Sequence, residues 1–434
     1  FEVLTALSSI IRPGVSNNGG KQSYLKRHLG LEKVEVAHPI LEPILRDTYG
    51  CLIYQEQVIQ IAARMAGMSL GEADGLRKCM SKKGRWKPME TYKARFYDGA
   101  RAQGISESVI DVVYRQIESF AGYAFCKAHS ASFALESFES LYWKAHHPAP
   151  FMAAVLSNEG GYYAPSEYVE EARRMGLAIL LPHVNTSEVR FTAEGTQPRG
   201  PLNALRVGLM RVRDLRAETA EAIVTARRER PFSSASDLLA RVPLNRKEAE
   251  NLVRCGAFDG LGPSRPSMLW EVALHFGKGP EVGSRIARRP RDSGVKLPDL
   301  PEYDFQKCLA LELEILDLSV SAHPLAFFAD RVARLREKYP TVRSVDLDKH
   351  VRETLYAVGW IVTGKLTRTQ ARGELMAFVT FSDEWGRFEA TFFPEVFQRL
   401  GLELRRGKGP FLIRGRVESE LGVVGLVATD VVLF

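Results

Sequence analysis

The most informative stretch in the C-terminal part of the chain is Phe388-Glu-Ala-Thr-Phe-Phe-Pro-Glu-Val-Phe-Gln-Arg-Leu400. Its alternating pattern predicts a strand that ends at Phe393, and Pro394 then opens a short helix that ends at Leu400. Two strand-like segments precede this stretch and two follow it: 354–363, 375–381, 410–417 and 422–433. Three strands, a helix and two strands is the order typical of an OB-fold barrel.

Upstream of this barrel the apolar period changes from strand-like to helical, so the sequence predicts a multidomain α+β protein. Residues 1–185 are predicted to be mostly helical, and residues 186–262 to form short helices separated by prolines and glycines. Residues 263–350 contain a basic linker and a Leu-rich helix, and residues 351–434 form the barrel. The expected helices are 46–66, 70–80, one beginning at Ser106, 130–146, 166–176, 217–228, 236–241, 246–255 and 305–316, and short strands are expected at 178–181 and 204–209.

The composition excludes several classes of protein. Of the 434 residues 45% are hydrophobic and 26% charged, which excludes wholesale disorder. The 59 Lys and Arg exceed the 52 Asp and Glu, and the net charge of +7 favours a polyanionic partner such as nucleic acid. No apolar run approaches the length of a membrane span, so we expect no membrane partner. The cysteines form no C-x-x-C pair, which argues against a zinc ribbon and indicates reduced thiols in a cytoplasmic protein: Cys51, Cys79, Cys126, Cys255 and Cys308.

The basic residues are concentrated in one segment. Positions 76–101 hold nine Lys or Arg and two acidic residues, a local excess equal to that of the whole chain. Arg77 and Lys78 lie late on a predicted helix, and Lys82 and Lys83 follow just past its end. Clustered cations of this kind suit a triphosphate or a DNA backbone. They equally fit a solvated basic helix end, which the helix dipole favours.

A second group of polar residues precedes the long helix predicted from Ser130. Cys126, Lys127, His129 and Ser130 follow a glycine and several aromatic residues. Backbone N–H groups at a helix start can hold phosphate, and nearby aromatic rings can stack on bases. A histidine in this position is also commonly structural. Cys126 is not predicted to be a nucleophile, because no His and Asx pattern of a cysteine enzyme accompanies it.

Other motifs indicate contacts with DNA. A polar stretch opens the helix predicted near residue 55, where its side chains could meet a sugar or base edge or simply cap the helix. Residues 204–262 contain two possible helix–hairpin–helix units, whose hairpin backbones would grip phosphates without reading sequence. The first hairpin lacks the glycine that such a turn prefers. The candidate DNA contacts of these motifs are Gln55, Gln57, Arg211, Arg213, Asn245 and Arg246.

The predicted barrel is rich in aromatic residues. Their rings could bind single strands, although most should belong to the core, and a barrel of this type also serves as a protein-interaction module. The residues concerned are Trp360, Phe378, Phe381, Trp385 and Phe388.

The search for catalytic carboxylates finds no centre. Two-metal phosphoryl transfer needs acidic residues that converge on one sheet, often as Asp-x-Asp. Asp346-Leu-Asp348 is the one such pattern, and it lies in a basic connector without a hydrophobic strand around it. The chain has no His-x-x-x-His pair and no Walker lysine loop. The sequence therefore predicts phosphate-binding groups, but no catalytic residue and no metal ligand.

Together these motifs resemble the bacterial C-family DNA polymerases, the alpha subunits of DNA polymerase III. The matching segments are Arg12-Pro13-Gly14, Tyr49–Gln57, Glu72–Lys83, Phe120–Ser130, Lys144–Pro148 and Leu181–Asn185. Three segments look specifically like the error-prone, lesion-tolerant branch: Phe125–His129, Gly160-Gly-Tyr-Tyr163 and Leu318–Leu325.

The resemblance implies a division of the chain and a set of partners. Residues 1–185 would be fingers, 186–262 tandem helix–hairpin–helix units and 351–434 the OB-fold. The family's metal-binding aspartates lie in a palm that would precede this chain, which begins at Phe1 without a methionine. Mg²⁺ would be bound by that palm and not by this chain, which alone would be inactive. The implied partners are template-primer DNA, an incoming dNTP, and the PHP and palm parts of the polymerase.

The resemblance also assigns roles to individual residues. Arg77 and Lys78 match the paired basic residues that meet the triphosphate, where the replicative branch usually has two arginines. His129 and Ser130 match the loop that faces the nucleotide, Cys126 stands where replicative enzymes usually carry Asn, and Arg12 lies in a matching motif. We hypothesise that the thiol and the lysine loosen nucleotide contacts and lower discrimination.

Two questions stay open at this level. No convincing sliding-clamp motif appears between residues 262 and 304, so binding to a clamp could depend on an accessory translesion protein. The alternative to a polymerase part is a stand-alone nucleic-acid-binding accessory protein without polymerase activity. A cysteine or metal hydrolase has almost no support.

Overall fold

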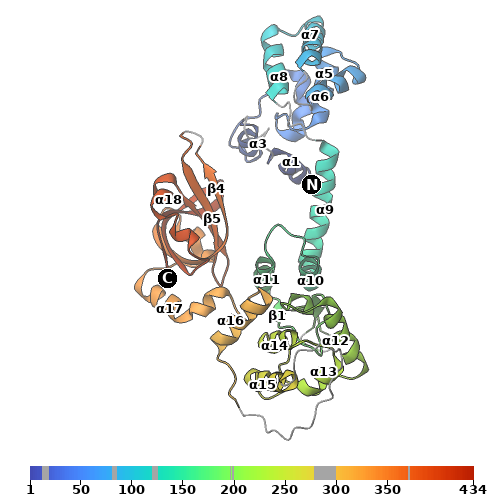
Figure 1. Cartoon of the computed structure of the whole chain (residues 1–434). Coiled ribbons are helices and arrows are strands. Elements are labelled where there is room, and N and C mark those ends of the chain that lie inside the picture. Colours follow the sequence, from blue (N-terminus) through green and yellow to red (C-terminus); the bar gives the residue numbers. More distant parts are fainter. Residues whose placement is uncertain are drawn as a thin grey trace. The chain divides into compact units, whose positions relative to one another are not determined.

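A computed structural model describes residues 1–11, 19–80, 86–119, 126–195, 197, 200–277, 300–369 and 372–434 (Figure 1). The chain forms two compact units, Phe1–Trp143 and Lys144–Phe434. Each unit is described by itself.

The first unit is helical. Val58, Ile61 and Met65 follow one another at helical spacing and are buried, as their pattern predicts. The helix that carries them packs closely on the helix that contains Gly99. A Cβ atom added at Gly99 would lie only 1.9 Å from the carbonyl oxygen of Ala66. The elements are α1 (Glu2–Ile10), α3 (Gly20–His28), η1 (Pro39–Leu41), α4 (Glu42–Leu45), η2 (Arg46–Thr48), α5 (Gln55–Ala66), α6 (Leu70–Met80), α7 (Trp86–Ala102), α8 (Glu107–Ser119) and α9 (Lys127–His146), which continues into the second unit.

The helix expected from residue 46 begins later than its apolar pattern suggests. Tyr49 and Gly50 adopt left-handed conformations, with φ of 51° and 76°, which breaks the chain before α5. Gln57 then caps the new start by accepting from the backbone N–H groups of Ile53 and Tyr54, at 2.9 and 3.0 Å. The expectation of one continuous helix from residue 46 was therefore wrong for residues 49–54.

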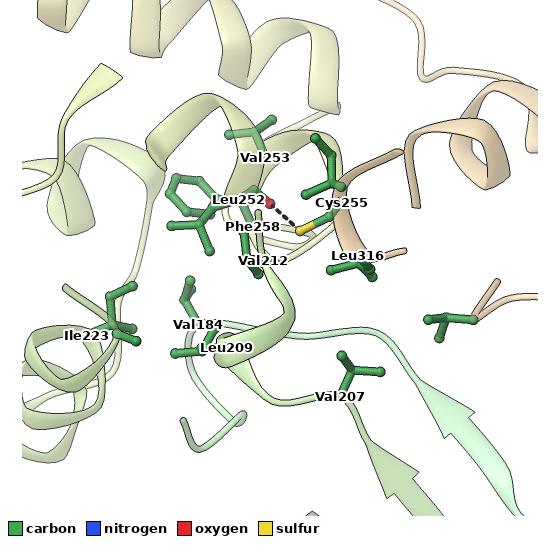
Figure 2. Close-up of a cluster of buried hydrophobic side chains, with 14 of the residues drawn as sticks. Val184, Val207, Leu209, Val212, Ile223, Leu252, Val253, Cys255, Phe258 and Leu316 are labelled. Carbon is green, nitrogen blue, oxygen red and sulfur yellow. Dashed lines mark hydrogen bonds between the residues drawn. The ribbon is translucent and has the colours of Figure 1, made fainter. Parts of the chain in front are cut away.

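The helical part of the second unit surrounds one apolar core. Side chains from several short elements meet there, among them Val184, Leu209, Leu252 and Phe258, and the Cys255 thiol donates to the Leu252 carbonyl (Figure 2). The elements are α10 (Pro148–Asn158), α11 (Pro165–Arg174), β1 (Ala178–Leu180), β2 (Thr192–Glu194), β3 (Ala204–Arg206), η3 (Leu209–Arg211), α12 (Ala217–Glu229), α13 (Ala235–Arg241), α14 (Arg246–Arg254), α15 (Arg265–Phe276), α16 (Phe305–Leu316), η4 (Pro324–Phe328), α17 (Ala329–Lys338) and η5 (Ser344–His350). The three short strands form a mixed sheet in the order β1-β3-β2.

The C-terminal residues form a closed five-stranded barrel, as the sequence predicts. The strand order is β4-β5-β6-β8-β7, with β6 and β8 parallel and the other neighbours antiparallel. Phe381, Phe388, Phe392 and Phe411 fill its interior. The elements are β4 (Thr354–Arg368), β5 (Leu375–Ser382), β6 (Arg387–Phe392), α18 (Pro394–Leu400), η6 (Glu403–Arg405), β7 (Phe411–Glu420) and β8 (Val423–Leu433).

Candidate nucleic-acid interface

The start of α5 and the end of α6 meet in the first unit. Arg77 Nη1 donates to Gln55 Oε1 at 2.8 Å, and Arg77 Nε donates to Asp74 Oδ1 at 2.7 Å. The other carboxylate oxygen of Asp74 lies 2.7 Å from Lys78 Nζ. These hydrogen bonds from Lys78 and Arg77 lower the pKa of Asp74. One carboxylate therefore holds both cations that the sequence predicts as triphosphate contacts.

The start of α9 is joined to the start of α5. The carboxylate of Glu56 accepts the backbone N–H of Lys127, with both oxygens at 3.0 Å, and the thiol of Cys126 at 3.2 Å. A carboxylate in this position satisfies helix-start donors and complements the helix dipole. The ammonium group of Lys127 lies 3.5 Å from the carboxylate of Asp47 and 5.4 Å from the ring centroid of Tyr54. Cys126 and Lys127 are thus brought to the same α5 start as Arg77.

The remaining predicted residues of this unit are placed differently. Gln57 is buried and donates to Thr48 Oγ1 at 2.9 Å, so its amide is occupied within the fold. Ser130 is also buried, and its hydroxyl shares a 2.6 Å hydrogen bond with Ser9. His129 is exposed, with its ring 4.6 Å from that of Phe133 in an edge-on arrangement. Arg12, Lys82 and Lys83 lie outside the described residues.

In the second unit the predicted first hairpin precedes α12. Asp214 takes the left-handed conformation here, with φ of 61°, in place of the glycine that the motif usually uses. Arg213 is exposed next to it. Arg211 is turned inward, with 14% of its side chain exposed, and donates to the Leu316 carbonyl at 2.8 Å and to Glu159 at 3.2 Å.

The predicted second hairpin ends at the start of α14. The side chain of Asn245 accepts from the N–H of Glu248 at 2.9 Å and caps this helix, and Arg246 pairs with Glu250 on its exposed face at 2.7 Å. Of the predicted contacts in this hairpin, Arg246 is the exposed cation, and Lys247 is exposed beside it.

Glu248 connects the two hairpins and was not predicted. It is fully buried and accepts from Arg216 Nε at 2.8 Å, from Thr219 Oγ1 at 2.9 Å and from the N–H of Asn245 at 2.8 Å. Burial alone would raise its pKa, but these hydrogen bonds outweigh burial and lower the pKa to about 2. The Asn-x-x-Glu spacing of a capping box could have revealed its role at α14, but not its contacts with α12.

The aromatic residues of the barrel divide into core and surface. Phe381 and Phe388 are buried, whereas Trp360 and Phe378 are half-buried. Trp385 lies at the turn between β5 and β6, with the guanidinium groups of Arg336 and Arg343 at 4.7 and 5.5 Å from its ring centroid. An exposed aromatic ring therefore lies beside cations on this domain.

Asp346, which belongs to the Asp-x-Asp pattern of the sequence, is held in ion pairs. Asp346 pairs with Arg343 and Lys349, each at 2.6 Å, and these contacts lower its pKa. The described residues contain no group of three or more His, Cys, Asp or Glu side chains that could hold a metal ion. Among the helices of the same described segments, none is both long and apolar enough to cross a membrane.

Two family models match segments of this chain. Residues 1–104 match the family model of the bacterial DNA polymerase III alpha subunit finger domain. Residues 176–268 match the model of a helix–hairpin–helix motif.

Individual relatives cover nearly the whole chain. The error-prone DNA polymerase of Symbiobacterium thermophilum is 32% identical over 98% of this chain and 42% of the relative. The DNA polymerase III subunit alpha of Aquifex aeolicus is 32% identical over 97% of this chain and 35% of the relative. The error-prone DNA polymerase of Mycobacterium tuberculosis is 34% identical over 99% of this chain and 38% of the relative. The chain is a homologue of the bacterial DNA polymerase III alpha subunits, and it spans about 40% of the length of these relatives.

Proposed function

We propose that this chain is the DNA- and nucleotide-binding C-terminal part of a polymerase III alpha-type DNA polymerase of the error-prone branch, which acts in replication and translesion repair. The observation that carries the proposal is the junction of α5, α6 and α9. Arg77 and Lys78 lie there within the segment 1–104 that matches polymerase fingers, and Lys127 is held at the same junction by Glu56. Three cations around ordered hydrogen-bonding groups suit the triphosphate of an incoming dNTP.

The proposed nucleotide site consists of the polar residues of the fingers. Asp74 and Gln55 orient Arg77 before the nucleotide arrives, and Glu56 fixes the α9 start that presents the next group of side chains. This arrangement reduces the entropy lost when the phosphates bind. The residues assigned to the site are Arg77, Lys78, Lys82, Lys83, Cys126, Lys127 and His129, whereas the buried Ser130 holds α9 against α1 through its hydrogen bond with Ser9.

The proposed DNA contacts lie mainly in the second unit. The exposed cations of the two hairpins would meet phosphates of the duplex, and the barrel would take single-stranded template. We assign the 1–185 segment to fingers, 186–262 to helix–hairpin–helix units, 263–350 to a connector and 351–434 to an OB-fold. Of the residues predicted to meet DNA, we assign Arg12, Gln55, Arg213 and Arg246 to DNA contacts. Gln57, Arg211 and Asn245 instead make hydrogen bonds within the fold.

The proposed reaction is Mg²⁺-dependent nucleotidyl transfer, with the metal held by palm aspartates outside residues 1–434. The chain would then act only together with the palm and PHP parts, and a sliding clamp or an accessory translesion protein would add processivity. Reduced cysteines and a chromosomal DNA substrate fit a cytoplasmic location.

A nucleotide-binding assay tests whether Arg77 contacts the incoming nucleotide. Binding of dNTP to the full chain with template-primer DNA is measured for the wild type, Arg77→Ala and the control Arg64→Ala. Arg64 is an exposed residue of α5 away from the junction. We expect Arg77→Ala to weaken binding about tenfold or more, because a charge-assisted hydrogen bond is lost, and Arg64→Ala to change it less than twofold. Equal effects of the two variants would contradict the proposed site.

Gel-shift and primer-extension assays separate the proposal from its alternative. A polymerase part shifts template-primer DNA and supports extension only when a palm fragment is supplied. Extension by this chain alone would contradict the assignment of the metal ligands outside it. DNA binding without any effect of a supplied palm fragment would favour a stand-alone accessory protein.

A further inference from the structure

The loop between α10 and α11 presents two tyrosines that no part of the proposed function uses. It contains the motif Gly160-Gly-Tyr-Tyr163, and Figure 1 shows it joining the two helices. Tyr162 is 91% exposed and Tyr163 is 42% exposed. Exposing two large rings at one loop tip is costly in water, so the loop is a candidate binding surface.

Contacts with the side chain of Tyr168 hold the loop in place. A Cβ atom added at Gly161 would lie 2.2 Å from the hydroxyl oxygen of Tyr168, so the backbone passes directly over that side chain. The Tyr168 hydroxyl also accepts from the backbone N–H of Tyr163 at 3.4 Å. Glu159 ends α10 in the left-handed conformation, with φ of 49°. These contacts fix the backbone that carries the two exposed rings.

The tyrosine rings form a connected series. The ring centroids of Tyr162 and Tyr163 are 5.0 Å apart at 85°, and those of Tyr163 and Tyr168 are 6.3 Å apart at 68°. Edge-to-face packing of this kind holds each ring while one face of the outermost ring stays open. The surface is therefore a preorganised aromatic platform, which we call the tyrosine platform and define as Tyr162 and Tyr163.

Cations lie at the base of the platform. The guanidinium carbon of Arg387, at the start of β6, is 5.7 Å from the ring centroid of Tyr163, and Arg387 Nη2 donates to Glu167 Oε2 at 3.0 Å. Burial raises the pKa of Glu167, and the nearby cations Arg387, Arg174 and Lys408 oppose this shift without cancelling it. The platform thus combines open aromatic faces with positive groups, as single-strand-binding surfaces do.

We propose that the tyrosine platform stacks on unpaired bases of single-stranded DNA. This inference rests on the proposed function, in which the chain binds template DNA. A peptide would require an apolar pocket around its anchor, whereas Tyr162 follows two glycines and projects into solvent. A base needs only a ring face, and stacking of this kind tolerates every sequence.

Affinity measurements on the full chain test the proposal. The probes are a fluorescent oligo(dT) strand and a blunt duplex of the same length, and the variants are Tyr162→Ala, Tyr162→Phe and the control Trp270→Ala, an exposed aromatic residue of α15. We expect Tyr162→Ala to weaken oligo(dT) binding about five- to hundredfold and to leave the duplex affinity unchanged. Tyr162→Phe and Trp270→Ala should stay within about twofold of the wild type. The salt dependence should not change, because no phosphate contact is lost.

Photo-cross-linking adds a direct readout. An oligonucleotide with 5-iodouracil is irradiated with the wild-type chain, and the linked peptide is identified by mass spectrometry. A link at Tyr162 or Tyr163 supports the proposal, as does a selective loss of oligo(dT) affinity in Tyr162→Ala. Wild-type affinity in Tyr162→Ala, or an equal loss for duplex, overturns the tyrosine platform while the proposed function stands. Absence of any DNA binding by the wild-type chain overturns both.

Discussion

Replacing Glu248 with glutamine should uncouple the two hairpins of the second unit. The carboxylate accepts hydrogen bonds from Arg216 and Thr219 at the α12 start and from Asn245 at the α14 start, and it is fully buried. A glutamine side chain has the same shape, but it has one acceptor oxygen and no charge. The change therefore leaves the guanidinium of Arg216 without its ionic partner.

The magnitude follows from the proton affinity of the carboxylate. Its pKa is about 2, against 4.5 for the free group, and each factor of ten in proton affinity corresponds to about 1.4 kcal/mol. The difference amounts to about 3 kcal/mol, and solvent screening at Arg216, whose side chain is 55% exposed, reduces it to about 2 kcal/mol. Because the folded pKa is depressed, this stabilisation is present above pH 4.5 and is lost as the pH falls towards 2.

Hydrogen exchange measured by mass spectrometry reports the local stability of α12 and α14. Glu248→Gln should lower their opening free energy by about 2 kcal/mol at pH 7 and flatten its dependence on pH between 4.5 and 2. Glu250→Gln, on the exposed face of the same helix, is the control and should change it by less than about 0.5 kcal/mol. A change below about 0.5 kcal/mol for Glu248→Gln, or equal losses for both variants, would show that Glu248 does not couple the hairpins.

Three further changes test other parts of the structure. Gly99→Ala places a methyl group 1.9 Å from the Ala66 oxygen and should lower the unfolding free energy of the first unit by about 1–3 kcal/mol in urea. Gly71→Ala has open space around it and should not lower this free energy. The reverse order of the two variants would contradict the close packing. Phe381→Ala empties the barrel core and should cost about 3–5 kcal/mol by thermal unfolding, and a loss below about 1 kcal/mol would count against that core. Asp74→Asn removes the carboxylate that orients Arg77 and Lys78 and should weaken the binding of inorganic tripolyphosphate a few-fold by calorimetry, and tighter binding would contradict this orienting role.

The barrel could be predicted well because alternating residues face one closed core. The helix Pro394–Leu400 was predicted with its observed bounds. The first strand was expected to end at residue 363, but β4 continues to Arg368 in its pairing with β5. Residues 363–368 are mostly exposed, so they carry no alternating pattern, and only the hydrogen-bonded partner strand reveals them.

The ends of the helices were harder to predict from the local sequence. The helix Trp86–Ala102 was not predicted, because its charged residues interrupt the apolar period. At α5 the buried apolar residues were identified correctly, but the left-handed turn at Tyr49 has no signal in helical spacing.

The candidate site depends on contacts between distant segments. Asp74 could have been recognised as the partner of two cations, since they lie three and four residues later on one helix. The contact of Glu56 with Lys127 joins residues 71 positions apart and depends on how α5 and α9 pack. Sequence spacing therefore identifies the cations, and tertiary packing decides which side chains hold them.

The salt dependence of template-primer binding by the full chain, measured by fluorescence anisotropy, tests whether this chain is the DNA-binding part of a polymerase. If the hairpin cations meet at least three phosphates, the logarithm of the association constant should fall with the logarithm of salt concentration with a slope of about −3 or steeper, whatever the DNA sequence. Failure to bind at low salt, or binding that does not depend on salt, would contradict the assignment of this chain to the DNA-binding part of a polymerase.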